Sequence, residues 1–340
     1  MQNLLIFFLQ ALIVVAGITL GILAIAGGIM NLALRFKAKA GPKEKIEILK
    51  LNDKYENFTE LLNQAVLSKT ELKNLEQQKK EELKLKKKQE KVGSIPLRKR
   101  IFVLNFCGDI RATQAENLRE EVTALLTIAT PKDEVLVKIE SGGGTVHGYG
   151  FAASQLERIH NRNIPLIAAV DKVAASGGYM MACVADKIIA APFAIIGSIG
   201  VIMQLPNFNR LLKKHDIEFE QIMAGEYKRT ITVFGENTNK ERKKMQEEVN
   251  DAHELFKSFI VNHRSNINID LVSTGEHWYG IRAQELRLVD EIITSDDYLV
   301  KAGEKADIYS LTYSAKKSLA KKLGLTLQKA ADYFAKTKAI

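Results

Sequence analysis

The stretch VLVKIESGGGTVHGYGFAASQLERIHNRNIPLIAAV, residues 135–170, decides the fold. It opens with a short apolar run at 135–140 and passes through a glycine-rich turn. Helical spacing follows around 146–160, and a second apolar run closes the stretch at 165–170. A strand, a helix and a strand in this order predict two parallel strands joined by a crossover helix. The sequence therefore predicts an α/β fold.

Segments on both sides extend this pattern. IFVLNF (101–106) predicts a buried strand, TQAENLREEVTALLTIA (113–129) a helix, and IEFEQIM (217–223) a further strand. A longer apolar run, IIAAPFAIIGSIGVIM (188–203), has only 16 residues and is interrupted by Pro192 and two glycines. This is too short for a bilayer crossing, so we expect buried strands there.

The N-terminus carries no charged side chain from residue 1 to 34. Its apolar run LQALIVVAGITLGILAIAGGIM (9–30) exceeds the roughly 20 residues that span a bilayer. A cleaved signal peptide is the alternative, but no basic residue precedes the run and the run is too long. We therefore expect residues 1–34 to be an uncleaved transmembrane anchor. Five basic residues between 35 and 45 follow it, and the positive-inside rule would place the rest of the chain in the cytoplasm.

The net charge of +9 is unevenly distributed. Residues 35–100 carry 19 Lys and Arg against 10 Asp and Glu, and residues 315–340 carry seven Lys against one Asp, whereas residues 101–314 are net −6. Basic flanks beside a membrane span favour attraction to anionic lipid, and no nucleic-acid partner is expected. Solvated lysine faces are the simpler alternative. We expect a charged helical stalk at 35–100, an α/β domain at 101–297 and a basic amphipathic tail at 298–340.

Three local elements could carry chemistry. The turn Glu140–Thr145 contains three successive glycines, whose bare N–H groups can face an anion or a developing oxyanion. Ser176, in VAASGGY (173–179), lies between a predicted strand and the start of a helix near Gly177. Lys228 ends the sequence GEYK. Each has a simpler interpretation: a tight turn, an ordinary helix N-cap and a solvated charge.

Considered together, these elements indicate nucleophilic catalysis. A serine nucleophile needs a base, and the six histidines lie in unrelated, mostly polar contexts. A lysine amine freed of its proton by apolar surroundings can serve instead. Ser198, in GSIGV (197–201), is the best candidate for a hydroxyl that orients this amine. The sequence lacks C-x-x-C spacing, so neither metal nor cofactor is expected, and Cys107 and Cys183 are expected to be small buried hydrophobes.

At this point the sequence resembles the signal-peptide-peptidase-A (SppA) group of serine–lysine peptidases, and its SohB branch in particular. The resemblance covers roughly residues 100–297. The matching motifs are ESGGG (140–144), VAASGGYMMACVADKIIA (173–190), GSIGV (197–201), GEYK (225–228) and HWYGIRAQELRLVDEI (277–292).

The resemblance implies a catalytic mechanism and an assembly. Ser176 would attack the scissile carbonyl, Lys228 would accept its proton and Ser198 would hold the lysine amine. The backbone N–H groups of Gly177 and of Gly143 or Gly144 would form the oxyanion hole. The family fold is of the ClpP/crotonase type, a superhelix of βαβ-like units that assembles into rings. In single-repeat members the serine and lysine meet across a subunit boundary, so a homo-oligomer is expected here.

The resemblance also implies substrates and a location. Family members cut remnant signal peptides and other unfolded or membrane-released peptides. We expect a bacterial inner-membrane protein with one N-terminal anchor, although the family usually places the catalytic domain outside the cytoplasm, in conflict with the charge rule. Two alternatives remain open from the sequence: a crotonase-type acyl-CoA enzyme and a non-catalytic membrane scaffold.

Overall fold

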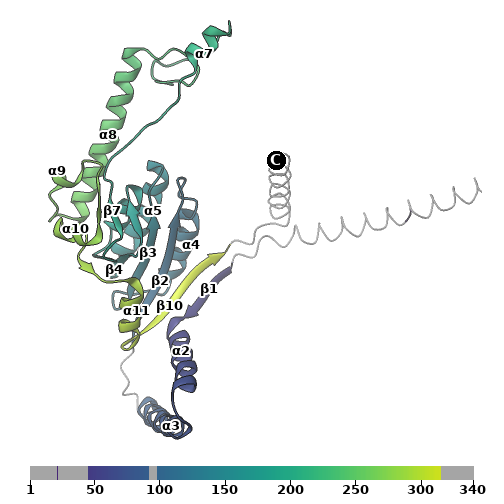
Figure 1. Cartoon of the computed structure of the whole chain (residues 1–340), viewed down its shortest axis with the longest axis vertical. Coiled ribbons are helices and arrows are strands. Elements are labelled where there is room, and N and C mark those ends of the chain that lie inside the picture. The colour runs from purple at the N-terminus through teal and green to yellow at the C-terminus, as the bar shows by residue number, and fades with distance from the viewer. Residues whose placement is uncertain (1–20, 22–44, 92–97, 315–340) are drawn as a thin grey trace, which may run out of the picture. The chain divides into compact units, whose positions relative to one another are not determined.

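The computed structural model describes residues 45–91 and 98–314, with the isolated residue 21 (Figure 1). The expected anchor at 1–34 and the tail beyond residue 314 lie outside these residues, apart from residue 21. None of the helices in the described ranges combines the length and the apolar character that a bilayer crossing requires.

A ten-stranded sheet organises the described chain. Its main path runs β1-β10-β2-β3-β4-β6-β9, and the pairs from β10 to β9 are parallel. The bounds along this path are β1 (Lys45–Lys50), β10 (Ala306–Ser314), β2 (Lys99–Gly108), β3 (Glu134–Ser141), β4 (Leu166–Val170), β6 (Lys187–Ala190) and β9 (Glu291–Ile292). The predicted strands at 101–106, 135–140 and 165–170 are thus confirmed as β2, β3 and β4.

A short branch leaves the main sheet at the end of β3. Ser141 pairs with Ala174 of β5 (Val173–Ala175), and β5 pairs in parallel with β7 (Ile195–Gly197). β8 (His277–Tyr279) closes the branch antiparallel to β7. The apolar run at 188–203 therefore contributes β6 and β7, as expected of buried strands.

Helices cover both faces of the sheet because side chains alternate along each strand. On one face, Phe102, Leu104 and Phe106 of β2 belong to the larger core cluster with α4 (Ala115–Leu125) and α5 (Val146–His160). On the other face, Ile101 and Val103 pack in a smaller cluster with α11 (Ser295–Gly303) and α2 (Leu51–Val66). The helices predicted around 113–129 and 146–160 are confirmed as α4 and α5.

The remaining helices lie in connections. They are α3 (Lys69–Lys91), α6 (Gly177–Ala182), α7 (Asn209–Lys214), α8 (Asn239–His263), α9 (Ile269–Val272) and α10 (Gly280–Glu285).

The sheet extends past the expected domain boundaries at 101 and 297. Residues 45–50, expected in the stalk, form β1, and residues 306–314, expected in the tail, form β10. The expected helical stalk itself forms α2 and α3. Strand pairing joins segments about 250 residues apart, and nothing in either segment alone indicates its partner.

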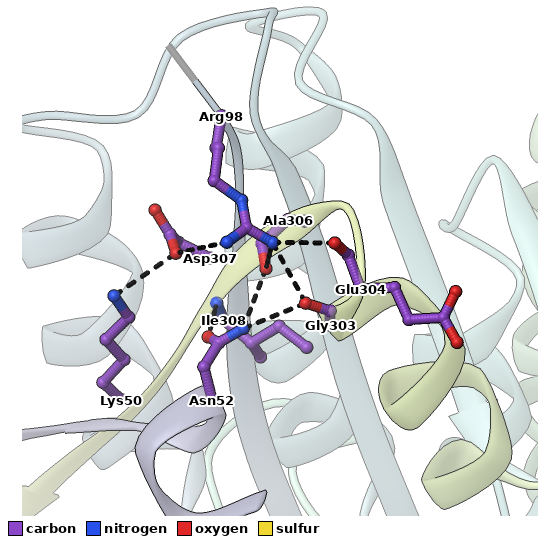
Figure 2. Close-up of polar contacts among 8 residues, drawn as sticks. All are labelled: Lys50, Asn52, Arg98, Gly303, Glu304, Ala306, Asp307 and Ile308. Carbon is purple, nitrogen blue, oxygen red and sulfur yellow. Dashed lines mark hydrogen bonds and ion pairs between the residues drawn. The ribbon is translucent and has the colours of Figure 1, made fainter. Parts of the chain in front are cut away.

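Asn52 joins the first turn of α2 to the end of α11 and the start of β10 (Figure 2). Its side chain is 8% exposed and donates to the carbonyls of Gly303 (3.2 Å) and Ala306 (2.9 Å), and it accepts from the N–H of Ile308 (2.7 Å). Arg98 donates to the same Gly303 carbonyl at 3.1 Å. This buried amide makes α2 part of the sheet domain.

Two local expectations were wrong. Residues 217–223 form no strand and are exposed, because no neighbouring segment offers them an edge to pair with. Cys107 is exposed, since it follows Asn105 on the face of β2 that lies beyond the cover of α11 and α2, whereas Cys183 is buried as expected.

Candidate functional site

Ser176 occupies a strained position between β5 and α6. Its φ of 53° and ψ of −119° lie where non-glycine residues are rare, at a cost of about 1–3 kcal/mol. Two backbone hydrogen bonds hold it there: its N–H donates to Gly197 O at 2.7 Å, and its carbonyl accepts from Met180 N at 3.0 Å. Its side chain makes no capping hydrogen bond to α6. The hydroxyl of this half-buried serine is therefore not used as an ordinary N-cap.

Ser198 lies beside Ser176. Ala175 is opposite Gly197 in the parallel pair of β5 and β7, so each serine directly follows a paired position. Ser198 also has a positive φ, 51°, and its N–H donates to Glu276 O at 2.6 Å. Adjacent strands run about 4.8 Å apart. The two half-buried serines thus leave the ends of neighbouring strands together.

The glycine turn packs against Ser176. A Cβ on Gly143 would lie 2.7 Å from Ser176 Cβ and 2.8 Å from the nitrogen of Gly177, and φ at Gly143 is 89°. Only a glycine allows the turn to approach this closely.

The expected oxyanion donors differ in their hydrogen bonding. The N–H of Gly143 donates to Ser141 Oγ at 3.1 Å. Within the part of the chain that the structure describes, the N–H of Gly144 has no hydrogen-bond partner. Gly177 is the first residue of α6, where an N–H has no carbonyl inside the helix to bind. Gly144 and Gly177 thus have N–H groups available to an anion, whereas that of Gly143 is engaged.

Charged side chains flank the turn rather than fill it. Lys172 forms an ion pair with Glu140 at 3.0 Å, and the hydrogen bond raises the pKa of the exposed Lys172. Among the described residues, no cluster of three His, Cys, Asp or Glu side chains has the arrangement of a metal site.

Lys228 lies in the segment 201–238 between β7 and α8, which we call the arm (Figure 1). It is exposed, in a turn where its N–H donates to Gly225 O at 3.1 Å. The 25-residue helix α8 is about 37 Å long, and its inner end is anchored in the core by Phe256 and Ile260. Among the described contacts, none joins Lys228 to Ser176 or Ser198. The described contacts therefore bring together the glycine turn, Ser176 and Ser198, and they do not include Lys228.

The arm exposes many large apolar side chains. Ile222 is 98% exposed. The others are Ile202, Met203, Leu205, Phe208, Leu211, Ile217, Phe219, Met223, Tyr227 and Phe234. Many exposed apolar side chains in one segment are typical of a surface that another protein covers.

Tyr149 was not singled out from the sequence. A Cβ added to Gly177 would lie 2.3 Å from Cγ of its ring, so this α5 side chain lies directly under the expected oxyanion residue. Its position in HGYG, one helical turn after the glycines, could have indicated a role beside the turn. A buried aromatic residue in a helix usually belongs to the hydrophobic core, however, so this signal is weak.

Comparison with known proteins gives a consistent family. The model of "Peptidase family S49 N-terminal" matches residues 1–156, and that of "Peptidase family S49" matches residues 158–309. The chain is 46% identical over 327 residues to "Probable protease SohB" of Haemophilus influenzae, covering 92% of this chain and 90% of the relative. It is 48% identical over 279 residues to "Probable protease SohB" of Buchnera aphidicola subsp. Schizaphis graminum, covering 82% of each. These matches confirm the resemblance to the SppA group and its SohB branch.

A solved structure is more distantly similar. It is "1510-N membrane-bound stomatin-specific protease K138A mutant in complex with a substrate peptide", with 14% identity and a TM-score of 0.43. The match covers 67% of this chain and 99% of that one. A likeness at this level supports no functional argument.

Proposed function

This chain belongs to peptidase family S49 and is a serine protease, and from that premise we propose that Ser176 is its nucleophile and Lys228 of a neighbouring subunit its general base. The family match favours a peptidase over an acyl-CoA enzyme or a non-catalytic scaffold.

The observation that carries the proposal is the strained backbone of Ser176. Ser176 has a φ of 53°, and its hydroxyl makes no capping hydrogen bond to α6. It lies where the glycine turn packs against the start of α6. Backbone strain of this kind is retained where the surroundings enforce it, and it is concentrated at functional sites. A mere N-cap would use its hydroxyl on the helix and would need no positive φ.

The chemistry follows from the groups around Ser176. Its Oγ attacks the scissile carbonyl carbon while the neutral Lys228 amine accepts the hydroxyl proton. The carbonyl oxygen becomes an oxyanion that accepts hydrogen bonds from the N–H groups of Gly144 and Gly177. The lysine ammonium then protonates the leaving amine, and a water activated by the same lysine releases the acyl group from Ser176. Ser198, beside Ser176, orients the amine.

The arm provides the argument for an oligomer. Lys228 lies on it, and the exposed apolar side chains of the arm favour a partner surface. A second copy that buries the arm would bring its Ser176 to the incoming Lys228 and would desolvate the amine, as a lysine base requires. In this proposal the fold is a ClpP/crotonase-type superhelix that closes into a homo-oligomeric ring.

The remaining proposals concern location and substrates. An uncharged segment at 1–34 would anchor the enzyme in the bacterial inner membrane. Signal-peptide remnants and other unfolded peptides would be cut there, since an extended chain can reach a site at the ends of β3 and β5.

Covalent labelling tests the proposal. The purified full-length oligomer is treated with a fluorophosphonate probe, and the labelled residue is identified by peptide mass spectrometry. We expect labelling at Ser176 that is lost in Ser176→Ala and in Lys228→Ala. Ser154→Ala, on α5, and Lys213→Ala, on the arm, should both label normally. Labelling of Lys228→Ala at the wild-type rate would show that another group is the base.

A further inference from the structure

Tyr149 connects the glycine turn to the protein interior through hydrogen bonds. Its side chain is fully buried, and its hydroxyl donates to the carbonyl of Asp109 at 2.8 Å. A very short contact joins the same hydroxyl to Ser141 Oγ. A phenol has one hydrogen, which is used on Asp109, so Ser141 is the donor in this contact. Burial raises the pKa of Tyr149, which keeps its hydroxyl protonated.

Ser141 links Tyr149 to the glycine turn by a hydrogen bond. It is 2% exposed, and its Oγ accepts the N–H of Gly143 at 3.1 Å. The hydrogen bonds therefore run in one direction, from Gly143 to Ser141, from Ser141 to Tyr149 and from Tyr149 to Asp109. A chain of bonds aligned in this way is mutually strengthening in a buried setting. It holds the residue immediately before Gly144.

The ring of Tyr149 supports the second oxyanion element. The Cβ position of Gly177 lies 2.3 Å from ring Cγ and 2.7 Å from Cδ2, so the backbone of Gly177 rests on the ring without space for a side chain. One side chain thus contacts Gly177 through its ring and the glycine turn through its hydroxyl.

We infer that Tyr149 and Ser141 are positioning residues that set the separation of the two oxyanion donors, the N–H groups of Gly144 and Gly177. This inference rests on the proposed function, since it assumes that an oxyanion forms beside Ser176. Neither side chain touches the substrate: they act through the backbone. Donors fixed in advance stabilise the transition state without reorganisation, and they matter little for substrate binding.

Tyr149→Phe is the decisive variant because it keeps the ring under Gly177 and removes only the hydroxyl. We expect kcat to fall about 10-fold or more, less than the 10²–10³-fold caused by deleting an oxyanion donor outright. KM should stay within about twofold, because the ground state does not use the oxyanion hole. A peptide aldehyde, whose adduct with a serine mimics the tetrahedral intermediate, should lose affinity in parallel with kcat/KM.

Tyr179→Phe is the matched control. Tyr179 is also fully buried, and its hydroxyl donates to a backbone carbonyl, that of Leu288, at 3.1 Å. Its loss should lower stability as much as that of the Tyr149 hydroxyl but leave kcat and aldehyde affinity unchanged. Ser141→Ala provides a second route if Tyr149→Phe folds poorly. Because both residues act through one chain of bonds, the double variant should be no slower than the slower single variant.

The outcomes separate the two proposals. If the wild-type oligomer labels at Ser176 but Tyr149→Phe matches Tyr179→Phe in kcat and aldehyde affinity, the positioning role is wrong and the proposed function stands. Additive losses in the double variant would also overturn it. If the active wild-type enzyme is labelled at a residue other than Ser176, the proposed function fails, and the inference fails with it.

Discussion

The backbone N–H of Ser176 donates a 2.7 Å hydrogen bond to the carbonyl of Gly197. This bond continues the ladder between β5 and β7 by one residue and fixes the two serines, 176 and 198, at adjacent strand ends. It also holds Ser176 at its positive φ. The proposed role of Ser198 in orienting an amine beside Ser176 depends on this relationship.

Mixing two inactive variants tests whether the serine and lysine come from different subunits. Ser176→Ala and Lys228→Ala should each be inactive alone. If the dyad is shared, oligomers reassembled from equal amounts would pair an intact serine with an intact lysine at about a quarter of the sites. Peptidase activity of the mixture is the measurement. A mixture that has demonstrably exchanged subunits but stays inactive would assign both residues to one chain.

The glycine turn should tolerate substitution at one end only. A Cβ on Gly144 would lie 2.0 Å from the carbonyl oxygen of Ile110, so Gly144→Ala must shift the backbone that carries a proposed oxyanion donor. We expect turnover to fall roughly 100-fold or more. Gly142 has no atom within 4 Å of its Cβ position and no positive φ, so Gly142→Ala should keep near-normal turnover. Steady-state peptide hydrolysis distinguishes them, and equal activity of the two variants would contradict this role for Gly144.

Glu121 should make stability depend on pH. The carboxyl is 5% exposed, and burial raises its pKa from 4.5 to about 7, although a hydrogen bond accepted from Tyr313 N opposes the shift. Between these values the unfolded chain loses the proton while the folded one keeps it, so the wild type loses stability as pH rises from about 4.5 to 7. Glu121→Gln should be equally stable near pH 4 and more stable by about 3 kcal/mol at pH 8.

The measurement is the unfolding free energy of the full-length protein from pH 4 to pH 9. Glu116→Gln, an exposed change on the same helix α4, is the control and should leave the pH profile unchanged. A constant difference between Glu121→Gln and the wild type across this range would show that Glu121 titrates normally.

Asn52 should be important for stability although it lies outside the proposed catalytic motifs. Asn52→Ala removes three hydrogen bonds (Figure 2). The carbonyls of Gly303 and Ala306 keep Arg98 as a donor, whereas the N–H of Ile308 loses its side-chain acceptor. A buried group left unsatisfied costs about 1–3 kcal/mol, so we expect a loss of about 2 kcal/mol. Urea unfolding followed by circular dichroism measures it, with the exposed Asn161→Ala as control. An unchanged midpoint would mean that α2 is not stabilised through this amide.

Local signals were enough to predict the main elements. Residues 101–106, 135–140 and 165–170 are short apolar runs bounded by turns, and α5 begins and ends where its helical spacing does. The glycine turn and Ser176 were recognised because each directly follows a strand, and their motifs carried the family resemblance. These features depend on residues close together in the chain.

Other features depend on contacts between segments that are far apart in the chain. β1 and β10 are strands because each lies beside a distant partner. Residues 217–223 have similar apolar spacing but pair with no strand in the described part of the chain. Cys107 is exposed because the helices on its face end before reaching it. Tyr149 has a buried hydroxyl and a ring against Gly177 only once α5 packs on the sheet.

The sequence by itself thus determined the strands and helices from about 101 to 170, the glycine turn and the serine at a helix start, because backbone propensity and apolar periodicity are local. Only the tertiary structure decided that Ser176 and Ser198 are neighbours and that Lys228 lies on an exposed arm. It also decided that the N–H of Gly143 donates to Ser141, whereas that of Gly144 has no partner among the described residues. These are contacts between segments far apart in the chain, and their energies come from pairing and burial that exist only after the chain has folded.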